Sequence, residues 1–336
     1  MAESKKEESQ GIAIKIKGLT KKFGKSIILD DLNLDVYKGE ILGVIGASGG
    51  GKTTLLKTMV GFILPDAGEV LFLRKNMMQS VHSYVKDARR TIGFAAQEPS
   101  FYLELKVMEN LEHFGTLFGI KKDERKKNAE RLLKAVNLWD VKDSSSVKLS
   151  GGMRKRLGLC TATIHDPSVF VLDEPTADLD PFSRKLIMKF IKDSNKEGKT
   201  VIIASHLLED IENLCDRIAL IHNKKIIKIG TPDELKGLCG KFKEVVIETR
   251  SKNYDKILSR LVDREGNIIN KAIEGKKLVI KTKDAEDMLN TILNIIKKEG
   301  EELIDINITK PSLNEIFDSL LEIKKDDKKD EKEAKK

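Results

Sequence analysis

A glycine-rich segment in the first quarter of the chain reads Gly46-Ala47-Ser48-Gly49-Gly50-Gly51-Lys52-Thr53-Thr54. An apolar run, Ile41–Ile45, precedes it, and apolar residues at helical spacing follow it. This order of strand, glycine loop and helix predicts a site for nucleotide phosphates, because loop N–H groups and a helix N-terminus attract anions. We expect Lys52 to reach the terminal phosphates and the Thr53 hydroxyl to hold the accompanying Mg²⁺. The alternative, a glycine-rich turn that precedes a lysine by chance, is disfavoured by the flanking strand and helix.

The composition of the 336-residue chain allows two domains. Charged residues make up 34% of the chain, and the net charge of +8 is not gathered in one basic block. With few aromatic residues as well, nothing prompts a nucleic-acid surface. Cys160, Cys215 and Cys239 lack the spacing of disulfide pairs or metal ligands, which favours a reducing compartment. The polar first residues predict no signal peptide, and no apolar run approaches the ~18 residues of a membrane-spanning helix.

Two further apolar runs end in polar side chains. Val169–Leu172 leads into Asp173 and Glu174, and Thr200–Ala204 is followed by Ser205 and then His206. Such runs are typical of parallel strands buried on both faces, and ligands bind at the carboxyl edge of open parallel sheets. We expect Asp173 to face Mg²⁺ and Glu174 to accept a proton from an attacking water. His206 is either a γ-phosphate contact or a structural histidine.

Other positions carry weak signals when each is considered alone. Gln97 follows a predicted apolar strand but could be an ordinary surface glutamine. Phe23 lies just upstream of the glycine segment and is either a core residue at a strand end or a ligand contact. Ser150 is a good N-cap for a helix that begins at Gly151 and Gly152. The free N–H groups there could bind a second anion, although an ordinary capped helix is the simpler interpretation.

The pattern of strands and helices predicts a large domain at 11–238 and a smaller one at 241–322. Residues from about 98 to 165 are mostly helical and amphipathic. The smaller domain has the order βαββαβ, which suggests a ferredoxin-like α+β fold. No chemistry is visible in it, so packing or regulation is its expected role. The charged segments 1–10 and 323–336 are predicted to be disordered.

Together and in this order, the motifs resemble the ATP-binding cassette of ABC transporters over roughly residues 11–235. The resemblance identifies Gly46–Thr54 as the Walker A loop and Val169–Glu174 as the Walker B strand. Gln97 falls in the Q-loop, and His206 corresponds to the switch histidine. The implied fold is an α/β P-loop NTPase with a parallel-sheet core, an antiparallel β subdomain and a helical subdomain.

The turn at Ser150–Gly152 resembles the family signature with one departure. Most members continue with glutamine where this chain has Met153. Because the serine, the glycines and the helix start are kept, we expect the signature to retain ATP binding. Met153 with the basic residues 154–156, and the segment Lys310–Phe317, are similar to exporter-type cassettes of the ABC-2 group.

The resemblance also implies roles for the individual site residues. Lys52 and Mg²⁺ would neutralise the β- and γ-phosphates, Glu174 would polarise the attacking water, and His206 would steady the γ-phosphate. Phe23 is placed to stack on adenine. The implied ATP contacts are Phe23, Gln97 and the nine residues quoted above, and the implied Mg²⁺ ligands are Thr53, Gln97 and Asp173.

The quaternary structure is implied in the same way. Two chains would pair head to tail around two ATP molecules, and a separate integral-membrane permease subunit would hold the dimer at the inner face of the cell membrane, within the cytoplasm. One alternative is a soluble ABC ATPase that acts on nucleic acid or ribosomes, but these typically carry tandem cassettes or long coiled coils. Another is a non-hydrolysing scaffold, which an intact Glu174 disfavours.

Overall fold

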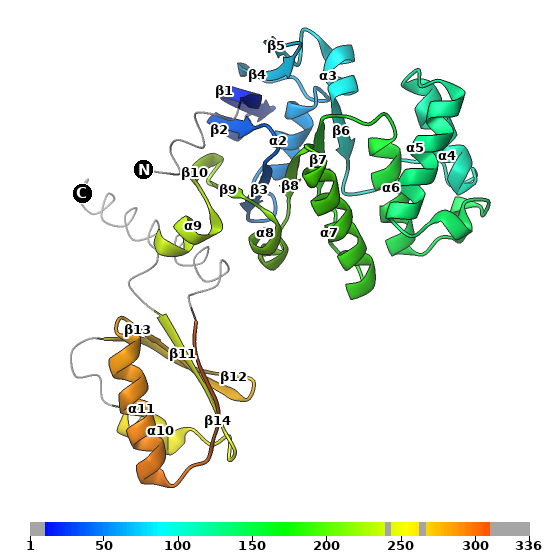
Figure 1. Cartoon of the computed structure of the whole chain (residues 1–336). Coiled ribbons are helices and arrows are strands. Elements are labelled where there is room, and N and C mark those ends of the chain that lie inside the picture. Colours follow the sequence, from blue (N-terminus) through cyan, green and yellow to red (C-terminus); the bar gives the residue numbers. More distant parts are fainter. Residues whose placement is uncertain (1–10, 239–242, 262–266, 310–336) are drawn as a thin grey trace. The chain divides into compact units, whose positions relative to one another are not determined.

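The computed structural model of the chain describes residues 11–238, 243–261 and 267–309. Contacts divide the chain into two units, Met1–Thr231 and Pro232–Lys336, which are considered separately (Figure 1). The predictions for residues 1–10 and for everything beyond residue 309 lie outside the described residues. The predicted domain bounds remain predictions.

The first unit is built on a sheet of six strands in the order β10-β9-β3-β8-β7-β6. All neighbours in it pair in parallel except β10 with β9. β3, β7 and β8 are buried at every position, which explains why they appear in the sequence as continuous apolar runs. The strands are β3 (Ile41–Gly46), β6 (Ile92–Ala95), β7 (Val169–Asp173), β8 (Thr200–Ala204), β9 (Arg217–His222) and β10 (Lys225–Gly230).

A second, antiparallel sheet has the order β2-β1-β4-β5. Helix α2 (Lys52–Met59) shares one apolar core with both sheets, since Leu55 and Leu56 pack in a cluster with Ile14 of β1 and Val44 of β3. This core fixes the glycine loop between the sheets. The remaining elements here are β1 (Ile12–Phe23), β2 (Ser26–Tyr37), β4 (Ala67–Arg74), β5 (Met77–Ser80) and α3 (Val85–Thr91).

A group of helices lies at the end of the first unit away from the antiparallel sheet (Figure 1). Within the predicted helical stretch, the amphipathic pattern of residues 107–137 is continuous, but the structure divides it into two helices. Gly119 has φ of +75°, a left-handed conformation that terminates the first of them. The helices are α4 (Val107–Leu117), α5 (Lys122–Ala135) and α6 (Gly151–Thr163), and α7 (Pro181–Lys196) and α8 (Leu208–Leu214) follow β7 and β8.

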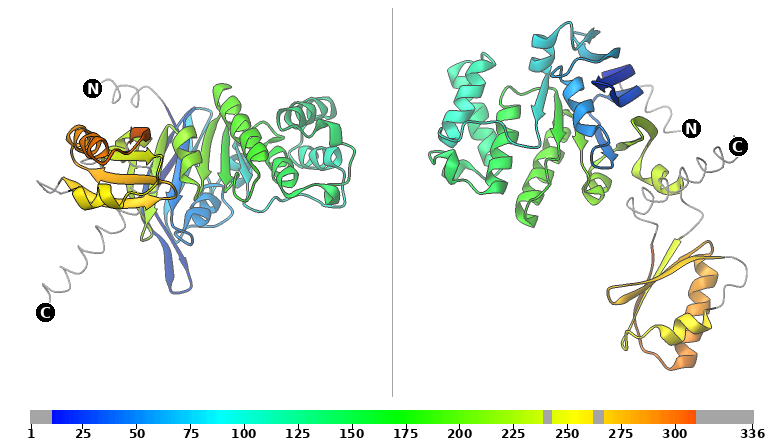
Figure 2. Two further views of the ribbon diagram at one scale, coloured as in Figure 1. Left: turned by 90° about the horizontal axis from the view of Figure 1, so that it is seen from below. Right: turned by 180° about the vertical axis from the view of Figure 1, so that it is seen from behind.

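The second unit contains the predicted order βαββαβ. Its antiparallel sheet has the order β12-β13-β11-β14, and α10 and α11 lie together on one face of it (Figure 2). Val245, Ile280 and Ile292 are fully buried in this core. The elements are α9 (Pro232–Leu238), β11 (Lys243–Thr249), α10 (Asp255–Arg260), β12 (Ile268–Glu274), β13 (Lys277–Thr282), α11 (Ala285–Glu299) and β14 (Leu303–Thr309). Among the described helices, none combines the length and apolarity needed to cross a bilayer.

Candidate functional site

The glycine loop between β3 and α2 has backbone angles and close contacts that favour glycine over residues with side chains. Gly49 and Gly51 have φ of +73° and +97°. A Cβ on Gly51 would lie 2.8 Å from Leu29 Cδ2, and one on Gly50 would lie 2.8 Å from the Ala47 carbonyl oxygen. Among the residues that the structure describes, no side chain caps the start of α2. Its first N–H groups are therefore available to an anion, as the sequence predicted for a phosphate site.

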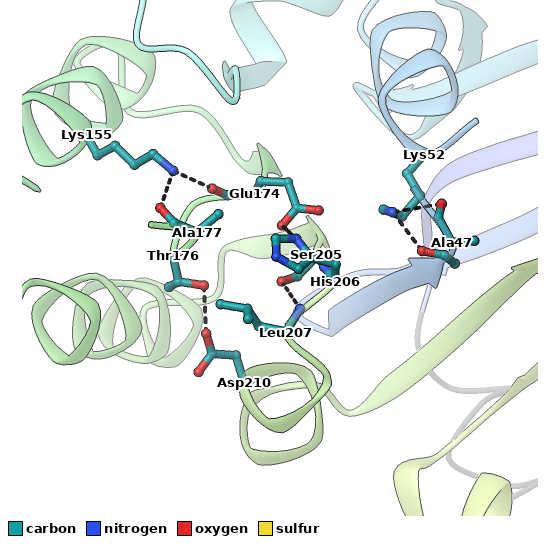
Figure 3. A network of polar contacts seen from close by, with 11 residues as sticks. Ala47, Lys52, Lys155, Glu174, Thr176, Ala177, Ser205, His206, Leu207 and Asp210 are labelled. Carbon is teal, nitrogen blue, oxygen red and sulfur yellow. Dashed lines mark hydrogen bonds and ion pairs between the residues drawn. The ribbon is translucent and has the colours of Figure 1, made fainter. Parts of the chain in front are cut away.

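Lys52 is the first residue of α2 and is only 8% exposed. Its Nζ donates to the carbonyl oxygens of Gly46 at 2.8 Å and Ala47 at 3.3 Å (Figure 3). The ammonium is thus held at the loop by neutral acceptors. Phosphate oxygens are stronger acceptors for a cation, so an incoming anion can replace these carbonyls.

A cavity of about 560 Å³ brings together most of the predicted site. Phe23 is 51% exposed beside it, with Lys21 Nζ 5.5 Å from its ring centroid, so Phe23 is not a core residue. Ile28 of β2 also lines this cavity, and its place in an ordinary strand carries no signal in the sequence. The lining residues are Phe23, Ile28, Ser48, Gly49, Gly50, Gly51, Lys52, Thr53, Thr54, Gln97, Glu174 and His206.

Asp173 ends β7 with only 2% of its surface exposed. Burial raises its pKa, an effect partly offset by the adjacent Thr53 hydroxyl and by Lys57 and Lys52. Within the described part of the chain, neither carboxylate oxygen makes a hydrogen bond with good geometry. Buried oxygens without partners suit a hard cation such as Mg²⁺, so Asp173 and Thr53 fit the predicted metal site.

Glu174 and His206 contact each other at adjacent strand ends. Glu174 Oε2 lies 2.8 Å from His206 Nδ1 and accepts the His206 backbone N–H at 3.3 Å (Figure 3). The glutamate is 7% exposed, whereas 56% of the histidine side chain is exposed. The Glu174 N–H continues the sheet by donating to Ala204 at 2.9 Å. The two residues predicted to act on the water and the γ-phosphate therefore form one unit.

The signature turn lies at the start of α6. Ser150 Oγ accepts the Met153 N–H at 3.3 Å, which confirms the predicted N-cap. A Cβ on Gly152 would lie 2.6 Å from Ser183 Oγ. A Cβ on Gly151 would have no atom of the described residues within 4 Å. Ser150 and Gly151 are exposed, and within the described residues no member of this turn lines the cavity of its own chain.

A hydrogen-bond network beneath the site was not foreseen. Thr176 Oγ1 donates to Asp210 Oδ2 at 2.7 Å, and Arg184 Nε donates to Asp210 Oδ1 at 2.7 Å. Lys155 of α6 donates to backbone carbonyls of the Glu174–Asp178 segment. Lys155, Arg184 and Asp210 lie on helices, and Thr176 lies in the turn after β7. No motif in the sequence indicates these contacts, so the sequence offered no signal for the network.

A second cavity of about 260 Å³ is predominantly apolar and lies beside the helical part. Gln97 and Glu174 line this cavity as well as the first one. Arg89 lies 5.0 Å from the centroid of the Phe62 ring at its wall. The aromatic lining residues are Phe62, Phe94, Phe114 and Phe118.

A glycine loop between β3 and α2, with a buried carboxylate at the end of the neighbouring β7, is the arrangement of a P-loop nucleotide-binding protein. Comparison with known proteins identifies the family to which the chain belongs. Residues 29–177 match the family described as ABC transporter. Nod factor export ATP-binding protein I of Ralstonia nicotianae is 35% identical over 66% of this chain and 68% of its own length. Linearmycin resistance ATP-binding protein LnrL of Bacillus subtilis is 28% identical over 90% of this chain and 96% of its own.

Solved structures agree with this relationship. An ATP-binding cassette determined as a dimer with ADP and Pi has a TM-score of 0.58 and 28% identity, over 65% of this chain and 98% of that one. The chain belongs to the ABC transporter family of ATP-binding proteins. It is an ATP-binding and ATP-hydrolysing subunit, and members of its family pair as dimers and work with membrane subunits. The predicted fold class and family are confirmed.

Proposed function

We propose that the chain is the motor subunit of an ABC-2 type exporter, which dimerises head to tail around two ATP molecules to drive a separate permease. The proposal rests mainly on one observation. The cavity of one chain holds the phosphate loop, Glu174 and His206, while the turn Ser150–Gly152, which is exposed at Ser150 and Gly151, lies outside that lining. A second chain related by a twofold axis would supply this turn, and such a pair closes without forming filaments.

In the proposed reaction, Lys52 exchanges the carbonyls of Gly46 and Ala47 for β- and γ-phosphate oxygens. Glu174 accepts a proton from the water that attacks the γ-phosphorus, and the bond from that phosphorus to the ADP oxygen breaks. His206, held by Glu174, steadies the γ-phosphate. Mg²⁺, bound by Thr53 and Asp173 with Gln97, would supply charge neutralisation of the phosphates.

The dimer is tested with Glu174→Gln, which keeps the geometry of the side chain but not its basicity. We expect a monomer without nucleotide and a dimer with ATP and Mg²⁺ by size-exclusion chromatography with light scattering. The double variant Lys52→Ala, Glu174→Gln is the control and should remain monomeric. A Glu174→Gln variant that binds ATP but stays monomeric at every concentration would contradict the head-to-tail pairing.

The export direction and the membrane partner have separate support. Two relatives are named for Nod factor export and linearmycin resistance. The apolar cavity shares Gln97 and Glu174 with the nucleotide cavity, so a segment bound in it would respond to ATP. We place the protein in the cytoplasm, at the inner face of the membrane, through this contact.

Copurification from detergent-solubilised membranes tests the partner. An integral-membrane subunit should accompany the tagged chain and be lost in Phe62→Asp, a change at the rim of the apolar cavity where the side chain is 54% exposed. Met77→Asp on β5, 61% exposed and outside that cavity, is the matched control. Tight ATP-dependent binding to RNA or ribosomes, with no membrane partner, would overturn the exporter assignment.

A further inference from the structure

Lys155 lies on α6 beside the apolar cavity, which it helps to line, and its side chain reaches the backbone that carries Glu174 (Figure 3). Its Nζ donates to the Ala177 carbonyl at 2.6 Å and to the Glu174 carbonyl at 3.2 Å. Burial lowers the pKa of this ammonium, while Asp178 and Glu174 act in the opposite direction. A partly buried cation directed at two main-chain oxygens forms charge-assisted bonds that are stronger than neutral ones.

The backbone that Lys155 holds is strained at both ends. Glu174 has φ of +50° and Asp178 has φ of +59°, a left-handed conformation that is costly for residues with side chains. Such a conformation persists only where surrounding contacts impose it. Lys155 supplies these contacts from α6, and Thr176 supplies another through the buried Asp210 at 2.7 Å.

We propose that Lys155 is a positioning residue that couples the signature turn to Glu174 of the same chain. The turn and the lysine are five positions apart on one helix, so α6 connects them over about 7.5 Å of rigid rise. The Glu174 side chain has its direction set by the left-handed backbone, and Lys155 holds that backbone through its carbonyls. When the partner's ATP engages Ser150–Gly152, the displacement of α6 reaches Glu174 in the other site.

This inference rests on the proposed roles of Glu174 and of the head-to-tail dimer. Lys155→Met tests it, because methionine keeps most of the apolar stem and removes every donor. We expect kcat to fall roughly tenfold to a hundredfold, the effect of losing charge-assisted hydrogen bonds at a positioned group. The Hill coefficient for ATP should fall toward one. ATP binding to the monomer should stay within about twofold of wild type, since Lys155 lies outside the nucleotide cavity lining.

Two further variants separate positioning from folding. Lys155→Arg keeps donors for both carbonyls and should restore most of the turnover. Lys192→Met removes an exposed lysine from α7 and should leave kcat and cooperativity unchanged. The NMR signal of the His206 ring should shift in Lys155→Met and not in Lys192→Met, because His206 Nδ1 contacts the Glu174 carboxylate at 2.8 Å.

The outcomes distinguish this inference from the proposed function. Unchanged kcat and an unchanged His206 signal in Lys155→Met would overturn the coupling. Loss of ATP binding and of thermal stability in both Lys155→Met and Lys155→Arg would show a structural role and would overturn it as well. A wild-type chain that does not turn over ATP, but whose His206 signal still depends on Lys155, would contradict the proposed function while supporting the positioning role.

Discussion

The phosphate loop and the signature turn are both glycine-bearing entrances to a helix, yet they provide different things. In the phosphate loop, Gly51 occupies the cap position with φ of +97°, and no side chain of the described ranges caps the N–H groups of α2. In the signature turn, Ser150 caps α6 with its own hydroxyl. The first is surrounded by cavity walls and the second is exposed. A glycine-bearing helix start therefore forms a cavity site only where other elements enclose it. We call the phosphate loop the enclosed half of the proposed ATP site and the turn Ser150–Gly152 the exposed half.

The largest expected effect is at the enclosed half. Lys52→Ala removes the buried cation that we propose to contact the phosphates, so we expect ATP affinity of the monomer to fall by roughly 100-fold or more. Isothermal titration measures this directly. Lys86→Ala, an exposed lysine on α3, is the control and should bind as wild type does. If Lys52→Ala still bound ATP with nanomolar or micromolar affinity, Lys52 at the phosphate loop would not be what binds ATP in the monomer.

A smaller and different effect is expected at the exposed half. Ser150→Ala in the Glu174→Gln background should weaken ATP-driven dimerisation by about tenfold and leave monomer binding unchanged, because the hydroxyl caps a helix outside the cavity. Analytical ultracentrifugation over a concentration series gives the dimer constant. Ser145→Ala, whose side chain caps nothing, should have no effect. A loss of monomer ATP binding in Ser150→Ala would place the turn in its own chain's site.

The buried carboxylate at the enclosed half predicts a pH dependence. Burial raises the Asp173 pKa above its ordinary value of 3.8, so its contribution to stability is largest in acid and declines as pH rises through the folded-state pKa. In metal-free protein, Asp173→Asn should raise Tm at pH 8 by a few degrees and make no difference near pH 3. The added stability from Mg²⁺ and ATP should shrink in this variant. An Asp173→Asn protein that loses stability at pH 8 without metal would show that other groups already satisfy the carboxylate.

The smallest effect is expected from the departure in the signature. Met153 contributes its backbone N–H to the Ser150 hydroxyl, and glutamine would contribute the same group. Met153→Gln should therefore change the dimer constant of the Glu174→Gln background by no more than about twofold, because the replacement conserves volume and helix propensity. A tenfold change in either direction would show that the side chain itself takes part in the exposed half of the site.

Prediction from the sequence succeeded where local chemistry decides the structure. The continuous apolar runs became β7 and β8, and Ser150 became an N-cap, because these outcomes depend on burial and capping within a few residues. The short elements β5, α3 and α8 were not predicted, since runs of 4 to 7 residues carry little periodicity. The break at Gly119 was missed because a glycine within an amphipathic pattern does not by itself end a helix.

The sequence by itself determined the ingredients of the site: a glycine loop, polar strand ends and a capped second helix. Only the tertiary structure decided that they meet. β8 pairs with both β3 and β7, with Ala204 opposite Val44 on one side and Asp173 on the other, so three strand ends converge at one edge. The contacts of Lys155, Thr176 and Asp210 depend on this convergence as well. Their partners are backbone and side-chain groups brought close by packing, and no local pattern encodes which distant carbonyl a lysine will reach.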